Sequence, residues 1–375
     1  MHTMRASRRK LMTAALLAGV SEPFFVGSAR PERYAVAAQE GTPGAEFPPG
    51  IDDAPVPVTF PRDDGPHSAF IEWWYYTGHL FTENGDRYGF EFVVFKGERN
   101  GMTLGYAFHF AVTDNPRGEF VYDQRISPID PAASAFAEDA VFDLQVGDWR
   151  MWGGDGEDRL LANMPGFAMA LRLSPDKAPT LHDGDGYIDY GDGQASYYYS
   201  RTRMTIAGSL AVDGVTLPVT GDAWMDHQWG DFNTFEDGGW DWFSLQLNDG
   251  SDLMLYVITT VDGTPRIVDG SLVAPDGALT VLDCDDFSIE PTGTWTSPHT
   301  GISYPSGWIV SLPAEQLEVT VTPSLPDQEL DTTASTGVVY WEGEVTASGT
   351  RAGSPIAGLG YVELTGYGNR DLVAI

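Results

Sequence analysis

Apolar and polar residues alternate along many short segments of this chain, and turn residues separate the segments at regular intervals. β-Branched and aromatic side chains are frequent in residues 87–95, 104–112 and 196–206, and again in residues 242–247 and 253–260. An alternation of period two between Gly, Asn and Asp turns is typical of strands that bury one face. No long amphipathic helix interrupts the pattern, so the sequence predicts an all-β protein.

Tight turns join these segments in sequence order. The turn pairs are Asn84-Gly85, Asp213-Gly214, Asp249-Gly250 and Asp262-Gly263. Such pairs supply the positive φ angles of short hairpin loops, so we expect sequential antiparallel strands. Many short strands must hide their edges, and closure into barrels is one way to do so. The predicted architecture is two antiparallel β-barrel lobes.

The chain divides into four predicted parts. They are an export signal at residues 1–37, a flexible leader at 38–57, a first lobe at 58–220 and a second lobe at 221–375. The signal has a basic stretch, a short apolar run and small-residue cleavage sites, and Ser7-Arg8-Arg9-Lys10 resembles a twin-arginine signal. The apolar run is too short to span a bilayer. We therefore expect export machinery as a partner and an extracytoplasmic location.

Acidic residues outnumber basic ones, with 54 Asp and Glu against 21 Lys and Arg and a formal net charge of −33. This charge repels phosphate backbones, so nucleic acid is not expected as a partner. The acids form either a functional face that attracts cations or a solvated coat. They are spread along the whole chain, which favours the coat.

The one cysteine, Cys284, rules out a disulfide within the chain. Its neighbours Asp283 and Asp285 oppose formation of a thiolate, so a nucleophilic role is not expected. We interpret Cys284 as a packed strand residue.

Three aromatic motifs, at residues 67–80, 221–230 and 360–367, have an unusual composition. The first contains Glu-Trp-Trp-Tyr and the second contains Trp-Met-Asp-His-Gln-Trp-Gly. On these runs the chain resembles the carotenoid 1,2-hydratase (hydroxyneurosporene synthase)/AttH family. The resemblance implies two lipocalin-like lobes. It also implies either hydration of a terminal C=C bond of an acyclic carotenoid or the unknown activity of other members, some labelled secreted hydrolases.

Hydration of an alkene needs a general acid, a water molecule and aromatic faces that stabilise the intermediate cation. Asp226, His227 and Asp241 are the catalytic candidates, because a carboxyl buried among indoles has a raised pKa. The candidate ligand-binding aromatics are Trp73, Trp74, Tyr75, Trp224, Trp229, Trp240, Trp242 and Tyr256. Alternatively, these Trp residues are core and the Asp226–His227 pair belongs to a buried structural network.

The family's His-x-Trp element matches His227 and Trp229. Its Tyr-x-Asp element, whose Asp is the presumed proton donor, matches Tyr256 but has Ile258 in place of the acid. We therefore expect binding of a long apolar ligand with little hydration of acyclic carotenoids. His182 lies in an acidic loop outside the motifs, so its substitution should have less effect than that of His227 or Trp229.

Other chemistries have less support in the sequence. The seven His residues include no His-x-His or His-x₃-His pair, and neither a Gly-x-Ser-x-Gly elbow nor a phosphate-binding Gly loop is present. No metal or other cofactor is expected. The leading hypothesis is an exported lipocalin-like protein that binds an apolar isoprenoid, carotenoid or lipid. A second form of this hypothesis adds that the protein modifies the ligand. The alternatives are a carotenoid hydratase-type enzyme and a secreted lipid-ester hydrolase.

Overall fold

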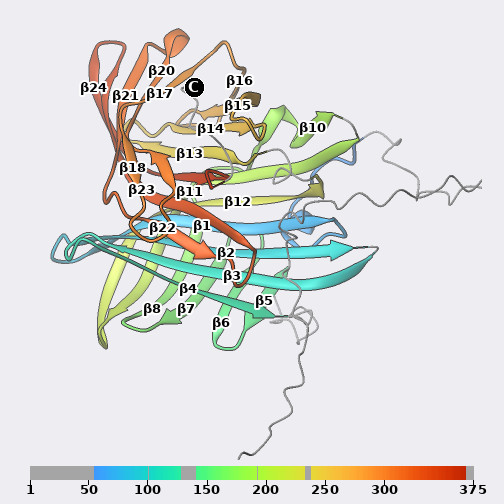
Figure 1. Ribbon diagram of the computed structural model, residues 1–375, viewed down its shortest axis with the longest axis vertical. Coiled ribbons are helices and arrows are strands. Elements are labelled where there is room, and N and C mark those ends of the chain that lie inside the picture. The colour runs from blue at the N-terminus through green and yellow to red at the C-terminus, as the bar shows by residue number, and fades with distance from the viewer. Residues whose placement is uncertain (1–54, 100, 128–140, 192, 233–237, 369–375) are drawn as a thin grey trace, which may run out of the picture.

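The computed structural model describes residues 55–99, 101–127, 141–191, 193–232 and 238–368. Over these ranges the chain forms β-strands and three short 3-10 helices, so the all-β prediction is confirmed (Figure 1). The predicted export signal and most of the predicted leader lie outside the described residues. In the described ranges, no helix combines the length and the apolar character that crossing a membrane requires.

The first sheet has the spatial order β4-β3-β2-β1-β12-β11-β8-β7-β6-β5, and β9 and β10 pair with β11. Its strands are β1 (Ile71–Thr82), β2 (Arg87–Arg99), β3 (Met102–Asp114), β4 (Glu119–Ser127), β5 (Phe142–Val146), β6 (Trp149–Gly153), β7 (Asp158–Met164), β8 (Phe167–Pro175), β9 (Thr180–Leu181), β10 (Tyr187–Gly191), β11 (Gln194–Val212) and β12 (Val215–Asp231). The helix η1 (Arg62–Asp64) precedes this sheet, and η3 (His182–Gly184) lies between β9 and β10.

The second sheet has the order β16-β15-β14-β13-β24-β23-β21-β20-β17, with β22 paired to β23. Its strands are β13 (Trp240–Leu247), β14 (Asp252–Thr259), β15 (Pro265–Val273), β16 (Leu279–Leu282), β17 (Ser288–Pro291), β20 (Trp308–Leu312), β21 (Leu317–Pro323), β22 (Glu329–Thr332), β23 (Val338–Arg351) and β24 (Ser354–Thr365). A separate ribbon pairs β18 (Thr294–Thr296) with β19 (Ser303–Pro305), and η4 (Pro313–Glu315) precedes β21.

The predicted segments and turns match the observed hairpins. For example, β11 and β12 meet at Asp213 and Gly214, whose φ angles are 49° and 81°. These left-handed conformations are the ones that a two-residue hairpin loop of this type needs. All strand pairs in the described chain are antiparallel, as the short turns imply.

The change from the first sheet to the second lies between Asp231 and Trp240. The predicted division at residue 220 falls inside β12. That strand pairs with β1 from Val219 to Gly230, so the whole second aromatic motif belongs to the first sheet. The sheet boundary is therefore later in the chain than the sequence indicated.

The two sheets are not closed into barrels, which corrects that part of the predicted architecture. Among the described residues, the first sheet ends at β4 and β5 and the second at β16 and β17. The end strands are short, at most nine residues, and a short edge is less prone to pair with another chain.

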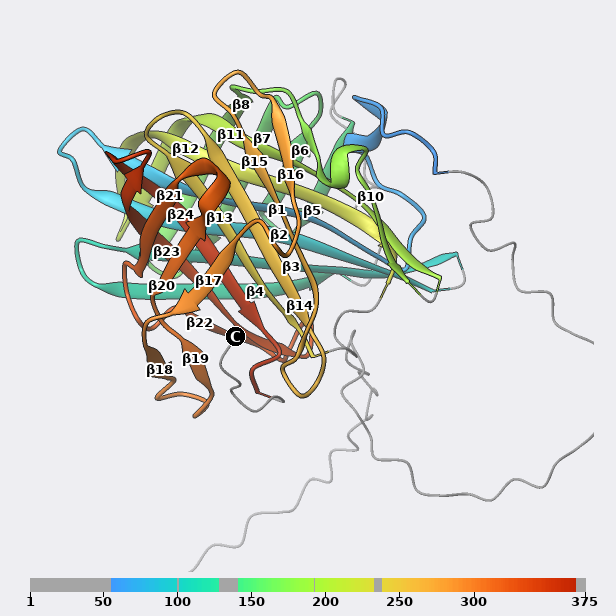
Figure 2. The same ribbon diagram turned by 90° about the horizontal axis from the view of Figure 1, so that it is seen from above.

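Three large apolar cores result from this arrangement, and a small fourth cluster contains Ala111, Leu330 and Tyr340. One lies inside the first sheet, around Trp74 and Trp149, and one inside the second, around Trp308 and Trp341. The third lies between the sheets, where Tyr75 and other outward residues of the first sheet meet residues of the second. Figures 1 and 2 show β1, β2 and β12 packed beside strands of the second sheet.

Buried ion pairs also join the two sheets. Asp252 of β14 accepts hydrogen bonds from Lys177 at 2.6 Å, Arg203 at 2.6 Å and Thr202 at 2.9 Å. These three donors belong to or adjoin the first sheet. The charge of Asp252 is thus compensated at a completely buried position, which fixes the relative position of β11 and β14.

Cys284 is exposed and lies in the turn between β16 and β17. The prediction of a packed strand residue was wrong. The run of acids around it ends the strand before Cys284 is reached.

Candidate functional site

The aromatic motifs fold as strands, and their side chains therefore point alternately to two faces. On β1, Trp73 and Tyr75 face the space between the sheets, whereas Trp74 lies inside the first sheet. On β12, Trp224 belongs to the core between the sheets, whereas Trp229 belongs to the core of the first sheet. Each motif thus contributes to two separate environments.

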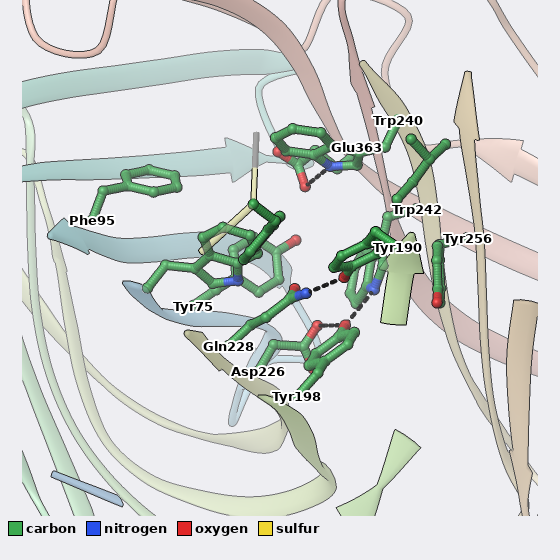
Figure 3. Close-up of a pocket in the computed structure, with 13 residues that line it drawn as sticks. Tyr75, Phe95, Tyr190, Tyr198, Asp226, Gln228, Trp240, Trp242, Tyr256 and Glu363 are labelled. Carbon is green, nitrogen blue, oxygen red and sulfur yellow. Dashed lines mark hydrogen bonds between the residues drawn. The ribbon is translucent and has the colours of Figure 1, made fainter. Parts of the chain in front are cut away.

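A cavity opens between the two sheets (Figure 3). The cavity volume is about 60 Å³. The empty space around it, including solvent at the open mouth, is about 610 Å³. Its walls are mainly aromatic, with two carboxyl groups and one amide. The lining residues are Trp73, Tyr75, Phe95, Tyr190, Tyr198, Asp226, Gln228, Phe232, Trp240, Trp242, Tyr256, Ile258 and Glu363.

Asp226 is the carboxyl group on the first-sheet wall. It accepts hydrogen bonds from Tyr198 at 2.5 Å, from Trp224 at 2.6 Å and from Ser200. Trp242 donates in turn to the Tyr198 oxygen at 3.0 Å, which Figure 3 shows at the cavity wall. Burial raises the pKa of Asp226 to about 6, although the three donors oppose this shift.

Glu363 is the carboxyl group on the second-sheet wall, and Figure 3 shows it on the opposite side of the cavity from Asp226. Trp240 donates to it at 2.9 Å. Burial raises the pKa of Glu363 to about 7, and the nearby charge of Asp226 adds to the rise. A smaller adjoining cavity shares Phe95, Trp240 and Glu363, so Glu363 lies where the two spaces meet.

Two further buried acids surround this site. Glu342 is the cross-strand neighbour of Glu363 and accepts from Tyr75 at 2.7 Å. Glu91 accepts from Tyr340 at 2.8 Å. Burial raises the pKa of both groups; the charge of Glu363 adds to the rise for Glu91, and the charges of Glu91 and Glu363 add to it for Glu342. The space between the sheets is therefore lined by carboxyl groups that favour their neutral form.

The structure separates the predicted catalytic residues. Asp226 lines the cavity, but His227, the next residue on the strand, points into the first sheet. Asp241 lies on the inner face of the second sheet, where Tyr367 donates to it at 2.8 Å. The predicted Asp226–His227 pair was wrong, because adjacent strand residues face opposite ways.

The predicted ligand-binding aromatics divide in the same way. Trp74, Trp229 and Trp224 do not line the cavity, although Trp224 supports it through its hydrogen bond to Asp226 and its ring contact with Trp242. The others line it, namely Trp73, Tyr75, Trp240, Trp242 and Tyr256. Ile258, the position at which the family resemblance implies an acid, also lies in the cavity wall. His227 and Trp229 are thus in a different place from Tyr256 and Ile258.

His227 belongs to a polar cluster at one end of the first sheet. Its Nε2 atom lies 3.0 Å from Glu72 Oε1, and His67 Nδ1 lies 2.8 Å from the same oxygen. The ligand atoms of these three residues lie within 4.8 Å of one another, so the group could hold a metal ion. However, Lys96 Nζ lies 3.3 Å from the other Glu72 oxygen and already compensates its charge. Trp229 stacks on His67, with 3.8 Å between ring centroids.

His182 is 1% exposed, although its loop is acidic. Its Nε2 atom lies 2.6 Å from Ser200 Oγ and its Nδ1 atom lies 2.9 Å from Ser271 Oγ. Burial lowers the pKa of His182 to about 3, so the ring is neutral at physiological pH. This burial could not be predicted from the sequence, because Ser271 belongs to the other sheet.

Sequence reasoning missed Glu363, Glu342 and Glu91 as residues of the site. Glu91 and Glu363 are lone acids among apolar strand residues, Glu342 is followed by Gly343 and Glu344, and Glu363 lies within the third aromatic motif. That pattern could have marked the three acids. It could not show whether they face solvent or another sheet.

A family model described as AttH-like matches residues 52–367. The chain belongs to the AttH-like family. An AttH-like relative of known structure, a protein described as AttH from Nitrosomonas europaea, is 34% identical to it. That similarity covers 86% of this chain and 100% of the other, with a TM-score of 0.75. The family prediction and the lipocalin-like all-β fold are confirmed.

More distant structures share the AttH-like fold. Kievitone hydratase from Nectria haematococca has a TM-score of 0.67 at 18% identity, covering 84% of this chain and 94% of that one. CghA with Sch210972 has a TM-score of 0.55 at 13% identity, covering 85% and 94%. At these identities the likeness is one of fold. No curated protein matches the chain in sequence.

Proposed function

We propose that this AttH-like protein binds an apolar, isoprenoid-type small molecule between its two sheets and adds water to, or removes water from, that molecule. The observation that carries the proposal is the pair of carboxyl groups, buried Asp226 and half-buried Glu363, on opposite walls of an aromatic cavity. Their pKa values of about 6 and about 7 let both groups exchange protons near neutral pH. Kievitone hydratase, which has the same fold, is named for a hydration.

The two carboxyl groups suit different steps of such a reaction. We assign proton donation to the alkene carbon to Asp226, which is the stronger acid of the two when it is protonated. Glu363, the stronger base when ionised, takes a proton from the attacking water. Because the pKa of Asp226 is the lower one, the reaction uses the less populated form in which Asp226 is protonated and Glu363 is ionised. The cation formed in between lies among indole faces, of which Trp73 and Trp240 stack with their centroids 6.4 Å apart.

The cavity is small for a long ligand. Its volume of about 60 Å³ fits one end of a ligand chain, and the open mouth lets the remainder of the ligand extend outward. The acids also lie elsewhere than at Ile258, the position that the family resemblance implies. We therefore propose a short isoprenoid end group as the reacting part, and binding of acyclic carotenoids with little hydration.

The test uses two probes, farnesol and neurosporene, with the purified protein. Binding is measured by quenching of Trp fluorescence, because three Trp residues line the cavity. Hydrated product is measured by mass spectrometry against a protein-free control. We expect both probes to bind and farnesol alone to gain water, with a rate that peaks between pH values of about 6 and 7.

Variants locate the activity. Asp226→Asn and Glu363→Gln should each lower the rate by about 100-fold or more while retaining binding. Asp241→Asn is the matched control, since it removes a buried strand carboxyl that faces the other side of the second sheet. Binding of neither probe, or equal rates in all three variants, would contradict the proposal.

A further inference from the structure

Four side chains from four different elements form one hydrogen-bonded row that begins at the cavity. Asp226 of β12 contacts Ser200 of β11, Ser200 contacts His182 of η3, and His182 contacts Ser271 of β15. Each of the four side chains is at most 4% exposed. The row thus leads from the cavity acid, through the protein, to the second sheet.

The donors and acceptors in this row have one consistent assignment. Ser200 donates its proton to Asp226, so its oxygen must accept from His182 Nε2–H. A neutral imidazole then has a free lone pair on Nδ1, and Ser271 donates to it at 2.9 Å. All of the protons in the row therefore point toward Asp226.

We propose that Ser200, His182 and Ser271 form a proton relay that reloads Asp226 after each turnover. The relay rests on the proposed function, because it assigns Asp226 the role of proton donor. His182 and the two serines are positioning and relay residues, since none of the three lines the cavity.

One passage moves one proton and leaves every group in the row neutral. Ser200 gives its proton to the Asp226 carboxylate and takes the Nε2 proton of His182. At the same time His182 takes the Ser271 proton on Nδ1, and Ser271 takes a proton from a hydronium ion, which becomes water. The result is a protonated Asp226 and a His182 that has changed tautomer. After Asp226 has given its proton to the substrate, the row returns to its starting state when the His182 ring turns by about 180° and the two serine hydroxyl groups reorient.

Ser271, at the outer end of the row, is 1% exposed, but residues beside this end of the row reach solvent. Asp183, next to His182, is exposed, and Asp269 is half-buried on the same face of β15 as Ser271, two residues away. These carboxyl groups would attract protons to the entrance. The row differs from a Ser–His–Asp hydrolase triad, because here the carboxyl group bonds to the serine and not to the histidine.

The first experiment needs no substrate. The exchange rate of the His182 ring N–H with water is measured by ¹⁵N NMR in the unaltered protein, in the Ser271→Ala variant and in the control variant Ser196→Ala. Ser196 is also a buried serine beside the cavity, bonded to Tyr190 and Gln228, but it is outside the row. We expect Ser271→Ala to slow the exchange by about tenfold and Ser196→Ala to leave it unchanged. An equal exchange rate in Ser271→Ala and in the unaltered protein overturns the relay.

The second experiment uses farnesol and separates the relay from the proposed function. Ser271→Ala and His182→Phe should retain the rate of the first turnover but lower steady-state turnover by about tenfold, because only reloading is slowed. Added imidazole should restore part of the steady-state rate in His182→Ala. A parallel fall of both rates overturns the relay, since it indicates a packing role. If the unaltered protein hydrates nothing, the proposed function fails and ring exchange alone decides the relay.

Discussion

At the scale of single residues, the buried charges are the feature that most distinguishes this chain. Many of its acids form the solvated coat expected from their spread, but several are fully buried. Glu72 is one of them, and it contacts His67, His227 and Lys96. Its hydrogen bonds outweigh the effect of burial and lower its pKa to about 2, so Glu72 is a buried carboxylate.

Glu72→Gln should therefore destabilise the protein strongly. The change removes one of the two carboxylates that pair with the buried Lys96, since Glu98 remains at 3.3 Å, and the loss of a hydrogen-bonded charged partner at a buried site costs about 1–3 kcal/mol. Glu83→Gln is the control, because Glu83 is an exposed acid in the following turn. Urea unfolding of both variants measures the difference, and similar midpoints would show that the Glu72 cluster does not stabilise the fold.

The burial of His182 changes an expectation drawn from the sequence. His182→Ala was expected to be milder than His227→Ala, because His182 lies in an acidic loop. The structure removes the basis for that difference, since the relative exposures of the two rings are 1% and 0%. His182→Ala would remove the partner of the Ser271 hydroxyl, and His227→Ala would remove one partner each from Tyr199 and Glu72.

At the scale of elements, the short helix η1 is attached to the end of the first sheet by a single side chain. Asp64 accepts from Tyr199 at 2.6 Å and from Arg201 at 3.0 Å, and its second oxygen accepts from the Asp155 backbone at 2.7 Å. Trp74 donates to the Asp64 carbonyl at 3.0 Å. The segment before β1 is thereby held over the first-sheet core.

Asp64→Ala should release this segment without unfolding the sheets. Hydrogen exchange followed by mass spectrometry should show faster exchange at residues 57–68 and little change in β2 or β11. Arg62→Ala is the control, because the Arg62 side chain is 59% exposed and its partners, Asp63 and the Pro57 carbonyl, belong to the same segment and not to the sheet. Unchanged exchange in Asp64→Ala would mean that apolar packing alone holds η1.

At the scale of the whole molecule, the carboxyl groups between the sheets link stability to pH. Burial raises the pKa of Glu91 to about 8, that of Glu363 to about 7 and that of Asp226 to about 6. The folded protein therefore binds more protons than the unfolded chain between the ordinary carboxyl values and about 8. Stability must fall as the pH rises through this window.

Between a pH of about 6.5 and 8, each of these acids should contribute a slope of up to about −1.4 kcal/mol per pH unit to the free energy of unfolding while it remains protonated in the folded protein, so Glu91 contributes most and Asp226 little. The buried His79, His109 and His182 do not oppose this slope, because their lowered pKa values, about 3, affect stability only below 6.5. Glu91→Gln should make the slope shallower. Denaturant unfolding at several pH values measures the slope. Equal slopes in the variant and the unaltered protein would mean that groups other than Glu91 bind the additional protons.

The sequence by itself determined the all-β class, the hairpin turns and the family. Strand alternation, turn chemistry and rare motifs are local properties, and local sequence carries them in full. The predicted strand at residues 87–95 and the turn at Asp213 and Gly214 are examples.

Only the tertiary structure decided which side chains meet. A strand has two faces, and the sequence does not say which face meets the second sheet, so Asp226 and His227 were paired although they point apart. Glu363 reaches the cavity only because the second sheet packs against the first, and His182 is buried for the same reason. Contacts between residues far apart in sequence depend on how the sheets are packed, and that packing is a property of the whole chain.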